Sequence, residues 1–174
     1  MSKPLRFLTA GVVAAFALWA GAALSAETTY TAKLDGASMV PEPVKTPATG
    51  ELTLTVSADG RSVRYQLTVK DITNPAAGDL HLGPVDGNGP LVVKLFPTGG
   101  AAAKKGPFSG VLAQGSFDAS DLIGPLKGAK LEELLEQIRE GNAYCNVHTN
   151  DGMDPPDSGP GDRRVGEIRG QLTR

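Results

Sequence analysis

Beyond about residue 26, apolar and polar residues alternate along most of the chain, which is the period of a β-strand with one buried face. In the clearest run, 63–69, every second residue is Val, Tyr or Leu. The residues Ser57-Ala58-Asp59-Gly60 predict a tight hairpin turn between two of these runs. The Pro-rich segment 41–47 is expected to be a surface loop, because proline cannot donate a hydrogen bond to a sheet. The expected strands are 30–34, 52–56, 63–69, 79–82, 91–96, 108–117, 143–149 and 165–172.

One segment departs from this alternation and has the period of a helix. Between residues 131 and 140, Leu131, Leu134, Leu135 and Ile138 recur on one helical face. We expect this stripe to pack on the sheet; the alternative is a surface that binds a partner. Together, the runs predict a mostly β fold: an immunoglobulin-like β-sandwich or flattened β-barrel of about seven to eight antiparallel strands, with one amphipathic helix.

The N-terminal segment has the pattern of an export signal. Two basic residues precede an uncharged apolar run from residue 7 to 24, and Ser25-Ala26 forms a small-residue cleavage site. We interpret 1–26 as a cleaved signal peptide and 27–174 as a single β domain; the alternative is a retained membrane anchor. The protein is therefore expected to be periplasmic or secreted, with no membrane span after cleavage.

Charge and cysteine content narrow the expected partners. The chain has a formal net charge of −2, and loss of Lys3 and Arg6 with the signal leaves 15 basic against 19 acidic residues, a net charge of −4. No basic run remains, so nucleic acid is not an expected partner. The single cysteine, Cys145, cannot form an internal disulfide, and we expect it to be a buried strand residue.

Two strands carry the residues with the clearest chemical potential. In 79–82 the leucines define one face, so Asp79 and His81 share the other. In 143–149 the same alternation places Tyr144, Asn146 and His148 on one face, opposite Cys145. If the two strands are neighbours, Asp79, His81 and His148 converge, with Tyr144 and Asn146 as same-face neighbours. Two imidazoles and a carboxylate suit a divalent transition metal such as Cu or Zn. The alternative is a pair of solvated or backbone-bonded strand histidines.

Other chemistries find no support in the sequence. No Gly-x-Ser-x-Gly sequence or supported Ser/His/Asp arrangement occurs, so no catalytic residue is assigned. The glycines of 83–90 lack the strand-to-helix setting of a phosphate-binding loop and are interpreted as turn residues. The aspartates of 150–162 do not have calcium-loop spacing, and we expect this segment to be a solvated loop.

Several of these segments together resemble the chordin-type domain, abbreviated CHRD. The resemblance rests on a Leu-x-Gly strand end, a Val-Pro loop, an alternating hairpin, a His-containing strand before an Asn-Gly-Pro turn, and two closing strands. Asp79 stands where the family often has the first histidine of a His-x-His element. The resemblance, to single-domain secreted or periplasmic bacterial proteins, implies an immunoglobulin-like β-barrel and an extracytoplasmic setting. The matching residues are Leu34-Asp35-Gly36, Val40-Pro41, 50–69, 79–83, 88–93, 144–149 and 166–172.

Three functional hypotheses follow from these observations. The first is an exported, non-enzymatic binding protein whose ligand is an extracytoplasmic protein or a small molecule. The second is a metal-binding or metal-dependent redox protein that uses His81, His148 and Asp79. The third is an envelope interaction module that uses the helix stripe and an exposed strand edge.

Overall fold

The protein is described here by a computed structural model, which covers residues 26–98, 102–153, 155 and 157–174. The predicted signal peptide lies outside these described residues except for Ala26. Each expected strand is present, although the last is confined to four residues of the expected 165–172. The strands are β1 (Thr28–Asp35), β2 (Thr49–Val56), β3 (Ser62–Thr73), β4 (Pro75–Leu82), β5 (Leu91–Phe96), β6 (Pro107–Asp118), β7 (Ala143–Thr149) and β8 (Ile168–Gln171).

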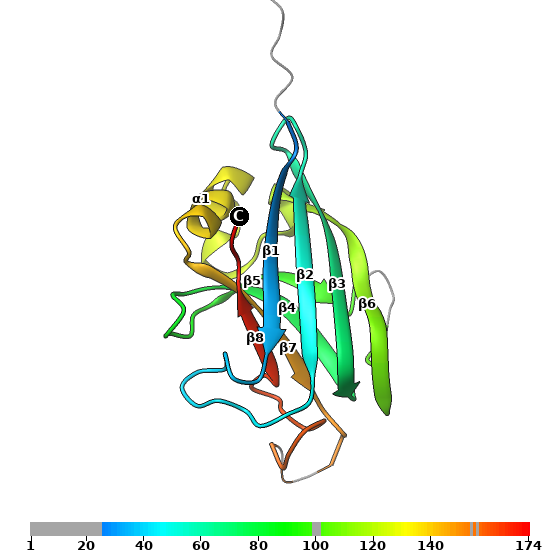
Figure 1. The fold of residues 1–174 in the computed structure, drawn as a ribbon. Coiled ribbons are helices and arrows are strands. Elements are labelled where there is room, and N and C mark those ends of the chain that lie inside the picture. The colour runs from blue at the N-terminus through cyan, green and yellow to red at the C-terminus, as the bar shows by residue number, and fades with distance from the viewer. Residues whose placement is uncertain (1–25, 99–101, 154, 156) are drawn as a thin grey trace, which may run out of the picture.

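All eight strands form one antiparallel sheet, in the order β5-β4-β7-β8-β1-β2-β3-β6. The sheet curls until its edge strands β5 and β6 approach each other, so the fold is a nearly closed, flattened barrel. In Figure 1, β1, β2, β3 and β6 run along the front, and β4 and β5 lie behind them. The predicted β2–β3 turn is present, and Gly60 has the positive φ of 69° that favours glycine.

The barrel interior is filled by the inward-facing members of the alternating runs. In β3, Val63 and Leu67 are fully buried, whereas Arg64 and Gln66 face solvent. Cys145 on β7 is fully buried within the same hydrophobic core, as expected. Burial raises the pKa of its thiol, which keeps the thiol protonated and unreactive.

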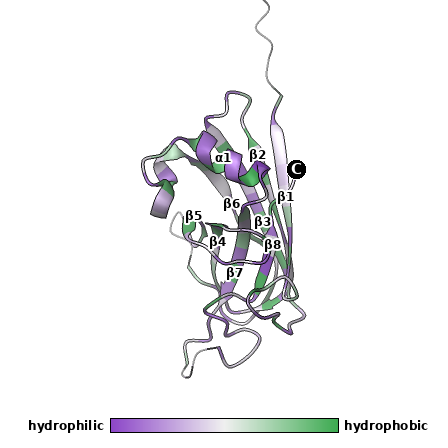
Figure 2. Cartoon of the chain, turned by 90° about the vertical axis from the view of Figure 1, so that its left-hand side faces the viewer, coloured by the Kyte–Doolittle hydropathy of each residue, from purple (hydrophilic) through white to green (hydrophobic). Residues whose placement is uncertain are grey.

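One α-helix and two short 3-10 helices join β6 to β7. They are α1 (Leu131–Arg139), η1 (Ala119–Asp121) and η2 (Gly124–Leu126). The four apolar stripe residues of α1 are all buried in the core cluster, so the prediction that the stripe packs on the sheet is confirmed. Figure 2 shows both hydrophilic and hydrophobic residues on α1, as expected of an amphipathic helix. Because the stripe is buried, it does not offer a surface for a partner.

Loops cover the outer face of β4, β7 and β8. Tyr144, Asn146 and Arg169 alternate with core residues and point out of the barrel, yet each is at most 4% exposed. Two backbone carbonyls of loop 83–90 accept hydrogen bonds from Arg169, which places this loop over the face. A side-chain-to-carbonyl hydrogen bond of 2.8 Å joins loop 83–90 to loop 36–48. The outer, polar face of β7 is therefore also buried, beneath these loops.

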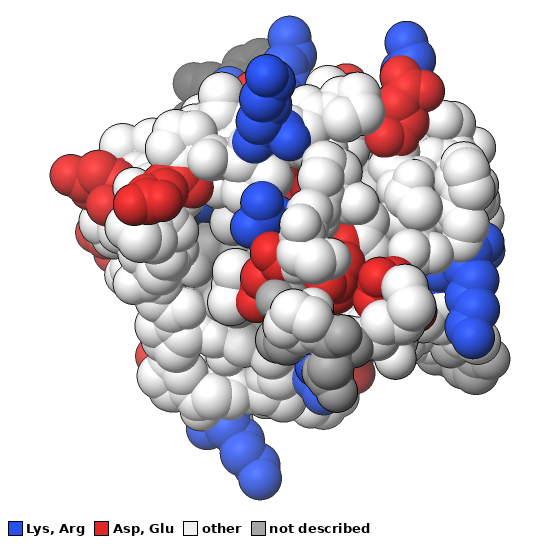
Figure 3. All heavy atoms as spheres, turned by 90° about the horizontal axis from the view of Figure 1, so that it is seen from below, with Lys and Arg blue, Asp and Glu red and all other residues white. Residues whose placement is uncertain are grey.

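In the loop that follows β7, the burial of one residue differs from what the sequence predicted. Asp162 is only 2% exposed, and its Oδ2 accepts hydrogen bonds from the backbone and hydroxyl of Ser158. The expectation that 150–162 is solvated throughout is wrong at Asp162, because the loop folds back on itself there and pairs Gly159 with Asp162. Seen from below in Figure 3, acidic and basic side chains lie side by side on this end of the molecule.

Candidate metal centre

The pairing of β4 with β7 decides where the predicted site residues lie. These two strands are antiparallel neighbours, and the register places Asp79 opposite Asn146 and His81 opposite Tyr144. His148 lies opposite Ala77. Directly paired residues point to the same face of a sheet, and so do alternate residues of one strand. Asp79 and His81 therefore share the covered outer face with Asn146, Tyr144 and His148.

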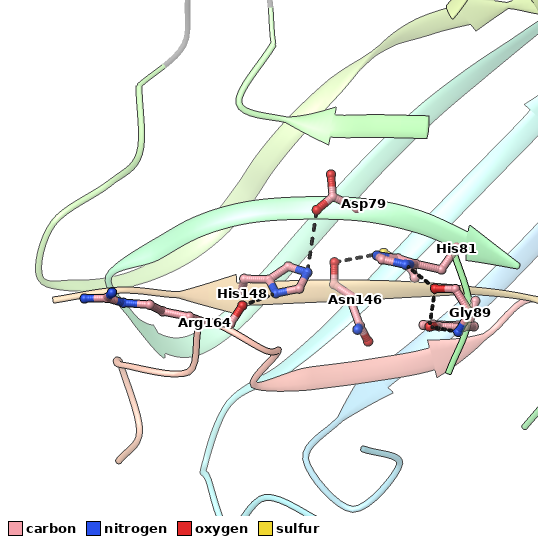
Figure 4. Close-up of polar contacts among 8 residues, drawn as sticks. Asp79, His81, Gly89, Asn146, His148 and Arg164 are labelled. Carbon is pink, nitrogen blue, oxygen red and sulfur yellow. Dashed lines mark hydrogen bonds and ion pairs between the residues drawn. The ribbon is translucent and has the colours of Figure 1, made fainter. Parts of the chain in front are cut away.

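The structure brings all three predicted residues together. One potential ligand atom from each of Asp79, His81 and His148 lies within 4.8 Å of the other two. His148 Nε2 and Asp79 Oδ2 lie 3.5 Å apart, and the two imidazole ring centroids are 6.3 Å apart. Figure 4 shows the Asp79 carboxylate above the His148 ring, with His81 farther along β4. The His148 and Asp79 side chains are 17% and 11% exposed, so the cluster is largely shielded from water.

Backbone carbonyls hold both imidazoles by the same ring nitrogen. His81 Nδ1 lies 3.0 Å from the Gly89 carbonyl oxygen, and His148 Nδ1 lies 2.9 Å from the Arg164 carbonyl oxygen. A carbonyl only accepts hydrogen bonds, so Nδ1 carries the proton in each ring. In the neutral form, an imidazole held in this way presents the lone pair of Nε2. A hydrogen bond from the other ring nitrogen to a backbone carbonyl is the usual way in which metal-binding histidines are oriented.

One of these Nε2 atoms has no partner in the structure. His81 Nε2 is buried and makes no hydrogen bond to any described residue. Leaving a buried acceptor unpaired costs about 1–3 kcal/mol. The cost is avoided if the lone pair binds a metal ion, so this atom is the observation that most favours a ligand at this position.

Burial sets the charge states of the cluster. It raises the pKa of the Asp79 carboxyl above its ordinary value, while His148 and Lys94 act in the opposite direction. Burial also lowers the pKa of His81, against the opposing hydrogen bond to Gly89. His81 is thereby kept neutral, which is the form that binds metal. A divalent cation would add positive charge beside the buried Asp79 carboxylate and so favour its ionised form.

The donor atoms stand slightly too far apart for a bound ion. Ligands bonded to one ion at ~2.0–2.1 Å can lie at most ~4.2 Å from each other. The cluster spans up to 4.8 Å, so metal binding requires the side chains to close by about half an ångström or more. The contact between His148 Nε2 and Asp79 Oδ2, at 3.5 Å, already falls within this limit, so the closure must involve the His81 side chain.

The two same-face neighbours have different positions. The Tyr144 ring stacks on His81, with ring centroids 5.1 Å apart and planes inclined by 11°. The Asn146 amide lies on the side away from Asp79 and the histidines (Figure 4), and its Oδ1 is buried without a hydrogen-bond partner among the described residues. Tyr144 therefore supports a candidate ligand directly, whereas Asn146 does not complete the cluster.

Arg169 is an important residue that the sequence analysis did not identify. Its side chain is fully buried, and its guanidinium carbon lies 3.7 Å from the centroid of the Tyr144 ring. The same guanidinium donates to the carbonyls of Pro84 and Gly87, at 2.7 and 2.9 Å. It thus holds the loop whose Gly89 carbonyl orients His81. In the sequence, Arg169 occupies an outward position of a strand, which normally indicates exposure to solvent.

The family assignment follows from a sequence comparison over most of this barrel. The model of the CHRD domain matches residues 30–155, well over half of the chain. The chain belongs to the CHRD family. The matched residues include all three residues of the candidate metal centre. The match ends before β8, so Arg169 lies outside the matched residues of this CHRD protein. No curated protein matches the chain. None of the helices in the described part of the chain is long and apolar enough to span a membrane.

Proposed function

We propose that this CHRD protein is an exported binding protein whose ligand is a divalent transition metal ion, held by Asp79, His81 and His148. The observation that carries the proposal is the buried, unpartnered His81 Nε2. Beside His81 are the His148 imidazole, which a backbone carbonyl also holds through Nδ1, and the buried Asp79 carboxylate. A structural role for the two histidines would be served by their Nδ1 hydrogen bonds and by the contact between His148 and Asp79, and would not require a buried His81 Nε2 without a partner.

The donor set limits the class of metal. Imidazole nitrogen suits Zn and Cu, whereas Ca and Mg prefer oxygen ligands throughout. For a site of nitrogen and oxygen donors, the general order of affinity places Cu²⁺ above Zn²⁺. We therefore expect both ions to bind, with Cu²⁺ bound more tightly.

Metal titration of the purified protein tests this proposal. We expect one equivalent of Cu²⁺ or Zn²⁺ to be retained after dialysis and measured by elemental analysis. His81→Ala and Asp79→Asn should each weaken binding by at least about 10-fold, since even the loss of a group that only orients a metal ligand costs about 10–100-fold in affinity. Asp59→Asn, an exposed carboxylate in the β2–β3 turn, is the matched control and should bind like wild type. Substoichiometric metal in wild type, or unchanged binding by His81→Ala, would refute the proposal.

Export is proposed from the N-terminal pattern together with the family assignment. The apolar run from residue 7 to 24 and the small residues at 25 and 26 support cleavage after Ala26. Intact-mass measurement of the protein recovered from the extracytoplasmic fraction of expressing cells should give a chain that begins at Glu27. A full-length chain retained in the membrane fraction would instead support the anchor.

A further inference from the structure

Three protein donors are fewer than a transition metal ion ordinarily takes. Among the His, Cys, Asp and Glu side chains of the described residues, the cluster consists of Asp79, His81 and His148. Cys145 cannot join it, because it is fully buried in the barrel core. Zinc sites have four ligands, and those with three protein ligands complete the set with water or another small molecule. An ion bound here would therefore have at least one coordination position to fill from solution.

The surroundings of the cluster provide a route for such a ligand. A cleft of about 360 Å³ is lined by Asp79 and His148 on one side. Its remaining walls include Ala76 and Ala77 of β4 and Asn150, which follows β7. Ala77 lies directly opposite His148 in the strand register, so a single methyl group stands beside the ligand imidazole. The small side chains leave space at this point, whereas His81 Nε2, on the other side, is closed to solvent.

Charge determines which small ligands are favoured. A divalent ion together with ionised Asp79 leaves a local charge of about +1. Arg164 also lines the cleft, but its guanidinium lies on the side away from Asp79 (Figure 4), where it donates to the Met153 carbonyl. Lys94 lies opposite Asp79 on β5 and contributes a further positive charge. The net positive charge of the ion with Asp79, in a partly desolvated position, favours an anion over a neutral ligand.

We infer that the metal centre keeps an open coordination position facing the Ala77–His148 cleft, and that this position binds hydroxide or another small monovalent anion. The inference rests on the proposed metal-binding function. It assigns the centre to the open type of metal site, in which a ligand from solution exchanges at the ion, rather than to the closed type that only stabilises a fold. The anion would enter along β4, past the methyl groups of Ala76 and Ala77.

Azide titration of the Cu²⁺-loaded protein tests the open position. Azide should shift the visible absorption and electron paramagnetic resonance spectra in a saturable way, with one site per copper. Solvent-proton relaxation should be enhanced in the loaded protein, and azide should reduce this enhancement. Stoichiometric copper with neither effect would show a closed coordination sphere and overturn the inference while leaving the proposed function intact. Absence of copper binding would overturn both.

A substitution in the cleft wall tests its location. Ala77→Leu should fill the space beside His148, so azide affinity should fall at least 10-fold while copper stoichiometry stays at one and copper affinity changes by less than about 3-fold. Ala58→Leu, on the exposed β2–β3 turn, is the matched control and should alter neither. If Ala77→Leu binds azide like wild type, the anion does not use this cleft and the inference is wrong. If Ala77→Leu does not fold, the wild-type relaxation measurement still decides between an open and a closed ion.

Discussion

At the scale of single residues, the candidate centre depends on buried polar groups whose partners are backbone atoms and loop residues. Glu167 is the clearest example beyond the ligands themselves. Its Oε2 accepts hydrogen bonds from the Thr149 hydroxyl at 2.6 Å and the Gly161 amide at 2.7 Å, while Oε1 accepts from the Thr46 hydroxyl. It is 1% exposed. One carboxylate therefore ties two separate loops to the residue that follows His148.

Replacement of this carboxylate should destabilise the protein strongly. Glu167→Ala leaves the buried Thr149 hydroxyl and the Gly161 amide without their acceptor, and we expect a loss of about 3 kcal/mol in the free energy of unfolding. Urea denaturation measures this loss. Glu132→Ala removes a solvent-exposed ion pair with Arg139 and serves as the control, with an expected loss below about 1 kcal/mol. Equal effects of the two substitutions would contradict this account of Glu167.

At the scale of elements, the geometry of His81 depends on loop 83–90 as well as on β4. The loop is closely apposed to the end of β4: a Cβ at Gly89 would lie 1.7 Å from the Leu82 carbonyl oxygen, so only glycine fits there. The Gly89 amide donates to the Tyr144 hydroxyl at 3.0 Å, and its carbonyl accepts from His81. Arg169 fixes the rest of the loop and stacks on Tyr144.

Arg169 should therefore influence metal affinity without touching the metal. In Arg169→Lys the compact ammonium cannot reproduce the planar fork that bonds two carbonyls and covers the Tyr144 ring. We expect copper affinity to fall by about 10-fold, as for the loss of a group that orients a metal ligand, with stoichiometry unchanged. Competition titration measures the affinity. Arg64→Lys, at an exposed ion pair with Glu27, should bind copper normally. An Arg169→Lys protein with full affinity would show that the loop holds Gly89 without this residue.

At the scale of the whole molecule, the candidate ligands join two strands that are far apart in the sequence. β4 and β7 are neighbours only because the chain returns to the same side of the barrel after β5, β6 and α1. The unfolded chain has no preformed arrangement of these three side chains, so an ion bound by all three should favour the folded state.

Metal should thus raise the thermal stability of the wild-type protein. At a free metal concentration of about 100 times Kd, the expected stabilisation is about 2.7 kcal/mol, and for a domain of this size this corresponds to a rise in Tm of roughly 5–10 °C. Differential scanning calorimetry with Zn²⁺, and again after a chelator is added, measures the effect. The His81→Ala protein is the control and should show little change. A wild-type Tm that does not respond to metal would count against a site formed only in the folded state.

The sequence alone determined the elements and the direction in which their side chains point. Alternation in 63–69 predicted a strand with Val63 and Leu67 inside, and the same rule separated Cys145 from His148, because successive strand residues must face opposite sides. The helical spacing of Leu131 to Ile138 likewise predicted a buried stripe. These features are local, since they depend only on backbone geometry and on which residues avoid water.

Only the tertiary structure decided which strands are neighbours and what covers them. Backbone hydrogen bonds between strands are nearly independent of sequence, so alternation could place Asp79 and His81 on one face but could not pair β4 with β7. The burial of Arg169 and Asp162, and the orientation of both imidazoles by the Gly89 and Arg164 carbonyls, depend on loops that fold over the outer face. The sequence therefore proposed three ligands, and the packing of distant segments brought them within reach of one ion.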